Sequence, residues 1–393
     1  MSETEVEPPR KRQRIRREIK FTSKYEDEKV EKTKPTIETE VSEETTIVGF
    51  NKRNQSILSV IHLEKPLTIQ DEFPIPEINE NEILVFNKAI GLNPIDWKGK
   101  KYGFGIYHFP WINGRESSGR VVKIGSKVKN FKIDDDVIIS STSYRDNRTS
   151  TFQQYTAIDS RLVWKLPKKF SYEDGATIGV GLVTAGILFY NSFNFELSKK
   201  PKTIDGTIVI WGGSTIVGIY ITQLAKIYGL TVISIASTTH AEYLQKIGVD
   251  HLINRHLTED EIVDKVKEVA PNGINYGIDC VSKQTSSIVL KLLALNSKKL
   301  NESLKPQFSG IVGVPKENTP ETVTIREVVI KKFHEDISFG KKFIDVTSSF
   351  LESEKIKPAR YKQYKGGLRI IDDALKDLEV KGANGEKYVV SIV

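Results

Sequence analysis

The chain has 393 residues, of which 38% are hydrophobic and 28% are charged, and its formal net charge is +7 at pH 7. This length exceeds that of one typical domain, so we expect two domains, and the apolar content excludes a chain that is disordered throughout. The only cysteine, Cys280, excludes an intramolecular disulfide and any metal site built from several cysteines.

Residues 1–45 are expected to form a disordered, charged tail, because they contain too few large apolar residues to build a core. A basic block at residues 10–17 resembles a nuclear-import signal or a polyanion-binding arm, and the alternative is a solvated segment without a role. The charged N-terminus and the lack of about 20 consecutive apolar residues argue against a secretory signal and a membrane span. We therefore expect a protein of the cytoplasm, with the nucleus as the alternative.

Residues 46–170 have the pattern of a β-rich domain. Short apolar runs that are typical of strands occur at 57–60, 83–86, 119–125 and 136–139. The chain returns to short strands and loops from residue 333 and ends in an apolar strand at 388–393. We expect the segment 333–393 to complete the first domain.

Residues 171–332 alternate between strand and helix patterns. Strands are expected at 207–211, 230–236, 252–253, 276–281 and 309–314, and helices at 219–228, before 248 and at 259–269. The first of these strands is apolar throughout, as in a strand that is buried on both faces. Such alternation predicts an α/β fold with a doubly wound parallel sheet.

A glycine turn at residues 212–218 is the most informative segment, because it joins the buried strand 207–211 directly to a helix. Gly212 and Gly213 let the chain reverse and approach a ligand closely, and the helix N-terminus that follows attracts a pyrophosphate. The middle glycine of G-x-G-x-x-G is absent, and a purely structural turn is the alternative. The candidate cofactor-binding residues are Gly212, Gly213, Ser214, Thr215, Ile216, Val217 and Gly218.

The end of the next strand favours NADP(H) over NAD(H). NAD-binding enzymes usually carry Asp or Glu there to bind the ribose hydroxyls, whereas this strand leads into Ser237 and Thr238. These hydroxyl groups, together with Arg255 after the third strand, suit the additional phosphate of NADP(H). The alternative role for Ser237 and Thr238 is to cap the following helix.

Six further motifs complete the pattern, at 93–98, 114–122, 175–176, 182–186, 279–282 and 384–390. Together with the glycine turn they resemble the medium-chain dehydrogenase/reductase superfamily over residues 46–393. The likeness is greatest to its zinc-independent fungal branch of quinone oxidoreductase-like proteins, trans-enoyl reductases and NADPH-dependent aldehyde reductases. This resemblance implies a GroES-like catalytic domain at 46–170 and an NADP-binding Rossmann domain at 171–332.

The residues at the expected zinc positions argue against a metal. Zinc-containing members place a cysteine in the segment that corresponds to residues 92–96, and a histidine where this chain has Arg115. A catalytic zinc needs three Cys, His or carboxylate ligands, whereas the six histidines are scattered without paired spacing. We expect no metal, and we interpret Cys280 as a wall residue beside the cofactor.

The resemblance also implies where the cofactor and the substrate bind. The further cofactor-binding candidates are Asp96, Thr184, Val281, Gly313 and Val314. The catalytic candidates, which would orient or protonate the substrate, are Asn93, Lys98 and Tyr102. Asn93 is also a good turn residue before Pro94, lysines are mostly solvated, and water is an alternative source of the proton.

The leading interpretation is a zinc-independent, NADPH-dependent oxidoreductase that transfers a hydride to a small aldehyde, enone, enoyl or quinone substrate. The alternative is a catalytically weak regulatory or trafficking factor that acts through its charged tail. Nucleic-acid binding is disfavoured, because the basic block lacks a recognition fold and interleaved aromatic residues. We expect a monomer or a homodimer.

Overall fold

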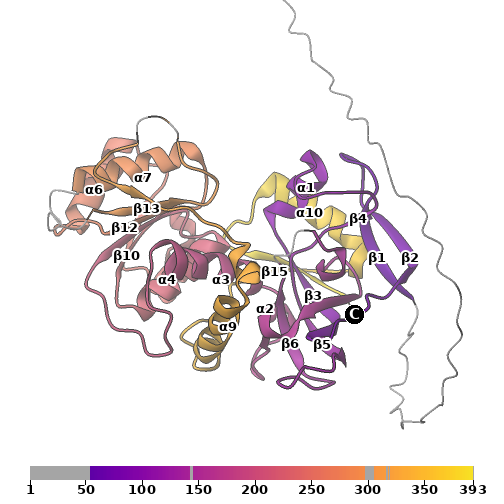
Figure 1. Cartoon of the computed structure of the whole chain (residues 1–393). Coiled ribbons are helices and arrows are strands. Elements are labelled where there is room, and N and C mark those ends of the chain that lie inside the picture. Colours follow the sequence, from indigo (N-terminus) through magenta and orange to yellow (C-terminus); the bar gives the residue numbers. More distant parts are fainter. Residues whose placement is uncertain (1–53, 142–144, 297–304, 316, 318, 393) are drawn as a thin grey trace, which may run out of the picture. The chain divides into compact units, whose positions relative to one another are not determined.

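The computed structural model describes residues 54–141, 145–296, 305–315, 317 and 319–392 (Figure 1). The tail expected at residues 1–45 lies outside the described residues. Within them, the strands form a three-stranded, a six-stranded and a seven-stranded sheet. The two larger sheets carry the elements that position the candidate site.

The seven-stranded sheet organises the β-rich domain. Its strands are β3 (Glu82–Leu92), β5 (Glu116–Ile124), β6 (Asp136–Ser140), β7 (Tyr155–Asp159), β8 (Val163–Lys165), β15 (Tyr361–Lys365) and β16 (Lys387–Ser391). Their order is β15-β16-β3-β5-β6-β8, with β7 also paired to β3. Apolar side chains such as Val85, Val121 and Ile139 are fully buried in one cluster on this sheet. Because β16 pairs antiparallel with β3, the end of the chain completes the sheet.

A smaller sheet and one helix extend this domain. The sheet has the order β2-β1-β4 and consists of β1 (Asn54–Val60), β2 (Thr68–Pro74) and β4 (Trp111–Ile112). Helix α1 (Pro94–Tyr102) follows β3 directly, with Asn93 as its N-cap and Pro94 in its first turn, where proline is well tolerated. Asn93 is thereby held at the end of a central strand.

The six-stranded sheet is entirely parallel, with the order β11-β10-β9-β12-β13-β14. Its strands are β9 (Thr207–Trp211), β10 (Thr231–Ala236), β11 (His251–Asn254), β12 (Tyr276–Asp279), β13 (Gln307–Gly310) and β14 (Thr324–Ile325). Its helices are α4 (Ile216–Ile227), α5 (Ala241–Lys246), α6 (Glu259–Val269) and α7 (Lys283–Asn296). Helix α7 was not predicted from the sequence.

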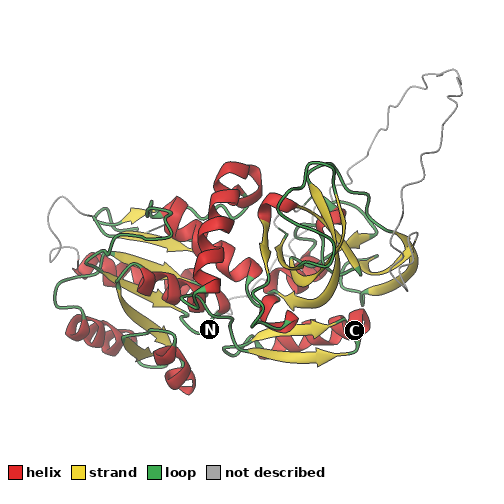
Figure 2. Cartoon of the chain, turned by 90° about the horizontal axis from the view of Figure 1, so that it is seen from below, coloured by secondary structure: helices red, strands yellow, loops and turns green. Residues whose placement is uncertain are grey.

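The side chains of β9 alternate between two cores. Ile208 and Ile210 cluster with residues of α4, whereas Val209 and Trp211 cluster with residues of α6 and α7. Helices therefore cover both faces of the parallel sheet (Figure 2). The expected doubly wound fold is confirmed.

The segment after residue 333 does not consist of short strands and loops alone, and that expectation is wrong. The helices there are α8 (Lys332–Glu335), α9 (Ile337–Glu352) and α10 (Ile371–Lys381). Gly340 and several β-branched and serine residues give α9 a low intrinsic helix propensity, which explains the error. Tertiary packing stabilises this helix instead, because Phe343, Phe350 and Leu351 on one face are buried.

One helical stretch among the described residues, Tyr172–Ser192, is long and apolar enough to cross a membrane by length and composition. It comprises α2 (Tyr172–Gly175), α3 (Gly179–Gly186) and a π-helical turn (Ile187–Ser192). No stretch of this kind was expected from the sequence. However, 89% of its most apolar window is buried inside the fold, which is typical of a core helix.

The indole of Trp164 joins β8 to α9. Its Nε1–H donates to Thr347 Oγ1 at 2.8 Å, and its ring stacks on Phe333 and meets Phe343 edge-on. All four side chains are fully buried. Helix α9 therefore packs on a strand of the β-rich domain and also belongs to the hydrophobic core of the parallel sheet. Because one core includes residues of both domains, the domain limits expected at residues 170 and 332 stay predictions.

Replacing Phe343 by Ala should lower the free energy of unfolding by about 3–5 kcal/mol, because it removes a buried ring that packs on Trp164. The matched control is Val380→Ala in α10. Because the Val380 side chain is 82% exposed, this substitution should lower the free energy of unfolding by less than about 0.5 kcal/mol. Urea denaturation followed by tryptophan fluorescence measures both variants. Equal effects would contradict the packing described for α9.

Candidate functional site

The glycine turn has little space for side chains. Gly212 has a φ of 84°, in the left-handed region that favours glycine. A Cβ atom on Gly213 would lie 2.0 Å from Ser234 Oγ, and one on Gly218 would lie 2.4 Å from the carbonyl oxygen of Gly212. Gly212 is therefore favoured by its backbone conformation and Gly218 by the close approach of α4 to the turn, whereas a side chain at Gly213 would collide with Ser234 on β10.

The N-terminus of α4 presents free donors. Thr215 is the N-cap, and its Oγ1 accepts a hydrogen bond from the amide of Gly218 at 3.1 Å. In the described part of the chain, the amides of Ser214, Ile216 and Val217 find no acceptor, and these residues are half-buried. Amides at a helix N-terminus fit a pyrophosphate, so the structure brings together the residues predicted for that role.

The loop after β10 contains the residues predicted to select the cofactor. Ser237 Oγ accepts from the amide of Thr239 at 3.3 Å and caps the 3₁₀ turn η4 (Thr238–His240). The alternative role of Ser237 as a cap is thus present in the structure. The amide of Arg255 donates to the carbonyl oxygen of Ala236 at 3.0 Å, so Arg255 lies beside the predicted hydroxyl residues.

The residues predicted for the nicotinamide end lie on three segments, which are α3, the residues after β12 and the residues after β13. Thr184 on α3 is buried and donates to the carbonyl oxygen of Val180 at 2.7 Å. Val281, which follows β12, is 40% exposed, and its side chain lies 2.7 Å from where a Cβ on Gly212 would be. The carbonyl oxygen of Gly313, next to Val314, accepts from Ser286 Oγ at 3.0 Å.

Cys280 directly precedes Val281 and lies at the glycine turn, since its Cβ is 3.3 Å from where a Cβ on Gly212 would be. Burial raises the pKa of its thiol to about 12, so the thiol is neutral at pH 7. A neutral thiol is a poor nucleophile. The geometry therefore agrees with its interpretation as a wall residue.

A buried polar cluster lies where β3 meets α1. The ammonium of Lys387 forms an ion pair with Glu116 Oε1 and donates to Asn93 Oδ1 at 2.8 Å. Asn93 Nδ2 donates to the same carboxylate at 2.7 Å, and the amide of Val180 donates to its other oxygen at 2.9 Å. Lys387, Glu116 and Asn93 are at most 7% exposed. This network connects β16, β5 and α3 around the predicted residue Asn93.

Asp96 lies beside this cluster and is also buried. Its Oδ2 accepts from the amide of Asn93 at 2.8 Å, while its Oδ1 has no hydrogen-bond partner in the described structure. Burial raises the pKa of Asp96 to about 6, although the buried guanidinium of Arg115 opposes this rise. The pKa of the Asp96 carboxyl group is thus well above its ordinary value.

The other two catalytic candidates lie further along α1. Lys98 Nζ lies 5.5 Å from the centre of the Trp97 ring. Tyr102 ends the helix and is 65% exposed, roughly 13 Å along the axis from its start. The structure therefore brings Asn93 and Asp96 together and separates Tyr102 from them.

Sequence reasoning missed Glu116 and Lys387 as members of this cluster. The signal for Lys387 was its place at the start of an apolar closing strand, because a charge that is buried in a sheet needs a partner. Glu116 had no comparable signal, because the residues that follow it are two serines and a glycine, and only the structure shows that they are buried.

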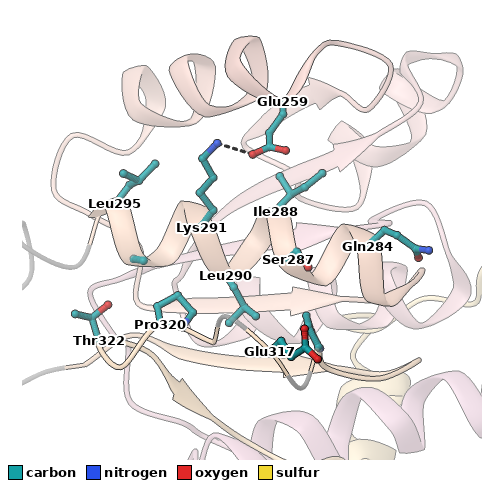
Figure 3. A pocket seen from close by; sticks show the side chains of 12 residues that line it. Glu259, Gln284, Ser287, Ile288, Leu290, Lys291, Leu295, Glu317, Pro320 and Thr322 are labelled. Carbon is teal, nitrogen blue, oxygen red and sulfur yellow. Dashed lines mark hydrogen bonds and ion pairs between the residues drawn. The ribbon is translucent and has the colours of Figure 1, made fainter.

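A separate cavity of about 850 Å³ lies beside α7 (Figure 3). The ion pair between Lys291 Nζ and Glu259 Oε1, 2.5 Å long, belongs to its wall, together with the exposed Leu295. Its lining contains no residue of the glycine turn, of the loop after β10 or of the cluster at Asn93. It is therefore distinct from the candidate site.

Comparison with protein families agrees with this organisation. Residues 79–168 match the model of the alcohol dehydrogenase GroES-like domain, and residues 217–298 match that of the zinc-binding dehydrogenases. An uncharacterized protein of Saccharomyces cerevisiae is 29% identical over 85% of this chain and 97% of its own length. A trans-enoyl reductase of Talaromyces variabilis is 27% identical over 80% of this chain and 91% of its own length.

Solved structures show the same fold. An alcohol dehydrogenase superfamily protein from Novosphingobium aromaticivorans has a TM-score of 0.73 at 18% identity, over 86% of this chain and all of the other. A mycobacterial protein solved in complex with NADPH has a TM-score of 0.66 at 20% identity, over 86% of this chain and 99% of the other. With its GroES-like and Rossmann-type domains, the chain belongs to the medium-chain dehydrogenase/reductase superfamily of oxidoreductases.

Proposed function

We propose that the chain is a zinc-independent, NADPH-dependent reductase that transfers a hydride to an aldehyde, an enone or a quinone. The observation that carries this proposal is a pair of buried cations, Lys387 and Arg115, beside Glu116 and Asp96. By the resemblance, zinc-containing members place a cysteine in the segment that corresponds to residues 92–96 and a histidine where this chain has Arg115. Here the segment has no thiol, and a guanidinium replaces the imidazole.

The charges of this cluster disfavour a divalent cation. Glu116 is already neutralised by Lys387, and Arg115 is close enough to act on the carboxyl group of Asp96. A zinc ion would meet two fixed positive charges in a buried, weakly screened environment. Zinc also needs three Cys, His or carboxylate ligands, and the described residues contain no cluster of three such groups.

The residues of the site fit a nicotinamide cofactor, which supplies the hydride when it is bound. The free amides of Ser214, Ile216 and Val217 would hold its pyrophosphate, and Thr184 and Val281 would border its reactive ring. The loop after β10 offers hydroxyl groups and Arg255 to an additional phosphate, which supports NADPH. The mycobacterial neighbour was solved with that cofactor.

The chain's own residues would position the substrate oxygen by hydrogen bonding. The Arg115 guanidinium carries donors beside Asp96, and the unpartnered Oδ1 of Asp96 could hold a proton in mildly acidic conditions. Asn93 is fixed by Lys387 and Glu116, so we assign it a positioning role. The low exposure of the cluster would keep water away from the reacting atoms.

An aromatic loop supports an apolar substrate. Phe104, Tyr107 and Phe109 are 50–65% exposed rather than packed in the core. The loop lies beside the polar cluster, since a Cβ on Gly105 would be 3.8 Å from Arg115 Nη2. Exposed aromatic rings around a polar centre suit a sizeable apolar or aromatic carbonyl compound.

A substrate panel tests the proposal directly. The purified protein should bind NADPH, as measured by nucleotide fluorescence, and should oxidise it with aldehydes, enones or quinones at 340 nm. Turnover with NADPH should exceed turnover with NADH at equal concentrations. Failure to bind either nucleotide would refute the proposed reductase function.

Metal analysis and Lys387→Met test the charge argument. Elemental analysis should find far less than one zinc per chain, and EDTA should leave turnover unchanged. Lys387→Met should cost about 3–5 kcal/mol of stability, because it leaves Glu116 buried and unpaired. Combining it with Glu116→Gln should recover much of that loss, and the exposed Lys341→Met is the control. One zinc per chain whose removal abolishes turnover would contradict the argument.

Asp96→Asn tests the titration of the buried carboxyl group. The pKa of Asp96 rises from 3.8 to about 6 on folding, so the folded state binds the proton more tightly between those values. As pH rises through this window, the wild type should lose up to about 3 kcal/mol of stability relative to Asp96→Asn. Urea denaturation at about pH 4 and pH 7 measures the difference, with the exposed Asp264→Asn as control. A stability difference that does not change with pH would refute the assignment.

A further inference from the structure

Arg360 contacts the loop that follows β10, although it lies 120 residues further along the chain. Its Nη2 is 3.3 Å from Nδ1 of His240, the last residue of η4. Its guanidinium carbon lies 4.0 Å from the centre of the Tyr243 ring, and its amide donates to the Tyr243 hydroxyl at 3.4 Å. Arg360 is therefore held against the predicted cofactor-selecting loop by side-chain and backbone contacts.

The guanidinium of Arg360 retains unused hydrogen-bonding capacity. Arginine has five N–H groups and only donates hydrogen bonds, so Nδ1 of His240 must act as the acceptor in this contact. The contact uses one of the five N–H groups of Arg360. Within the described part of the chain, no carboxylate forms an ion pair with Arg360 or Arg255. Both residues are exposed. Their charges thus remain available to an anion from solution.

The two arginines lie at the two ends of one short loop. Arg255 lies beside its start, through the bond from its amide to the carbonyl oxygen of Ala236, and Arg360 lies at its end, on His240. Between them the loop supplies the hydroxyl groups of Ser237, Thr238 and Thr239. Two guanidinium groups and several hydroxyl groups around one loop are the donors that a phosphate monoester requires.

We propose that Arg360 is a specificity-determining residue that binds the 2′-phosphate of NADPH together with Arg255. In a Rossmann domain the adenosine ribose lies at the end of the second strand, which here is β10. This inference rests on the proposed function, because it needs a dinucleotide in that orientation. It adds a cofactor contact from outside the Rossmann domain, since Arg360 immediately precedes β15 of the β-rich domain.

A second contact from the closing segment supports this placement. A Cβ atom on Gly385 would lie 2.9 Å from Cε1 of His240, so the turn before β16 packs directly on the same ring. His240 is buried, and its ring is thereby fixed between Arg360 and Gly385. The imidazole thus positions the guanidinium at the loop.

The test compares nucleotide affinities of Arg360→Leu and of a matched control. Arg369→Leu removes the same charge from an exposed residue of the same domain, in the 3₁₀ turn η6 (Gly367–Ile370). Fluorescence titration should show NADPH binding weakened about tenfold by Arg360→Leu, with NADH binding unchanged. Arg369→Leu should change neither, and Arg360→Lys should lie between. Inhibition by 2′,5′-ADP, but not by 5′-AMP, should weaken in parallel.

The outcomes separate this inference from the proposed function. If the wild type prefers NADPH and Arg360→Leu keeps that preference, the inference is wrong while the proposed function stands. Equal weakening of NADPH and NADH, or a lowered melting temperature without nucleotide, would indicate a structural role and also overturn it. A wild type that prefers NADH or binds neither nucleotide would overturn both.

Discussion

The buried ion pair between Lys387 and Glu116 is the constraint on which the candidate site depends. Both side chains are almost completely buried. An unpaired charge in this place would therefore destabilise the fold far more than the ion pair does. The pair therefore connects β16 to β5. Asn93 Oδ1 accepts a further hydrogen bond from the Lys387 ammonium, and the amide of Val180 donates to the second carboxylate oxygen of Glu116. One interaction thus joins the end of the chain, the central sheet and the helix that leads into the Rossmann domain.

The parts of the fold that sequence predicted well have local signals. Strand β9 was found at its observed bounds, because a run of apolar residues between turn signals needs no distant partner to be recognised. The glycine turn was found for the same reason, since Gly212, Gly213 and Gly218 serve backbone geometry within seven residues. These signals were enough for the parallel sheet and for the glycine turn, whose role in binding a pyrophosphate stays a prediction.

The missed features depend on partners far apart in the sequence. Lys387 and Glu116 are 271 residues apart, and no local pattern shows that each neutralises the other. Helix α9 has a weak propensity of its own and is stabilised by Trp164 and its neighbours in the fold. Aromatic residues pose the same difficulty: Trp111 is fully buried, whereas Phe104, in the adjacent loop, is 65% exposed. Only packing distinguishes the two.

The closing segment contacts both ends of the candidate site, and the register of β16 links them. Lys387 begins this strand and reaches the cluster at Asn93, while Gly385, two residues earlier, packs on His240. Because side chains alternate along a strand, a shift of one residue would turn Lys387 to the opposite, equally buried face of the sheet and leave Glu116 unpaired. The same shift would carry the turn at Gly385 away from His240. The ion pair therefore also fixes the loop that we assign to cofactor selection, although the two lie on different domains.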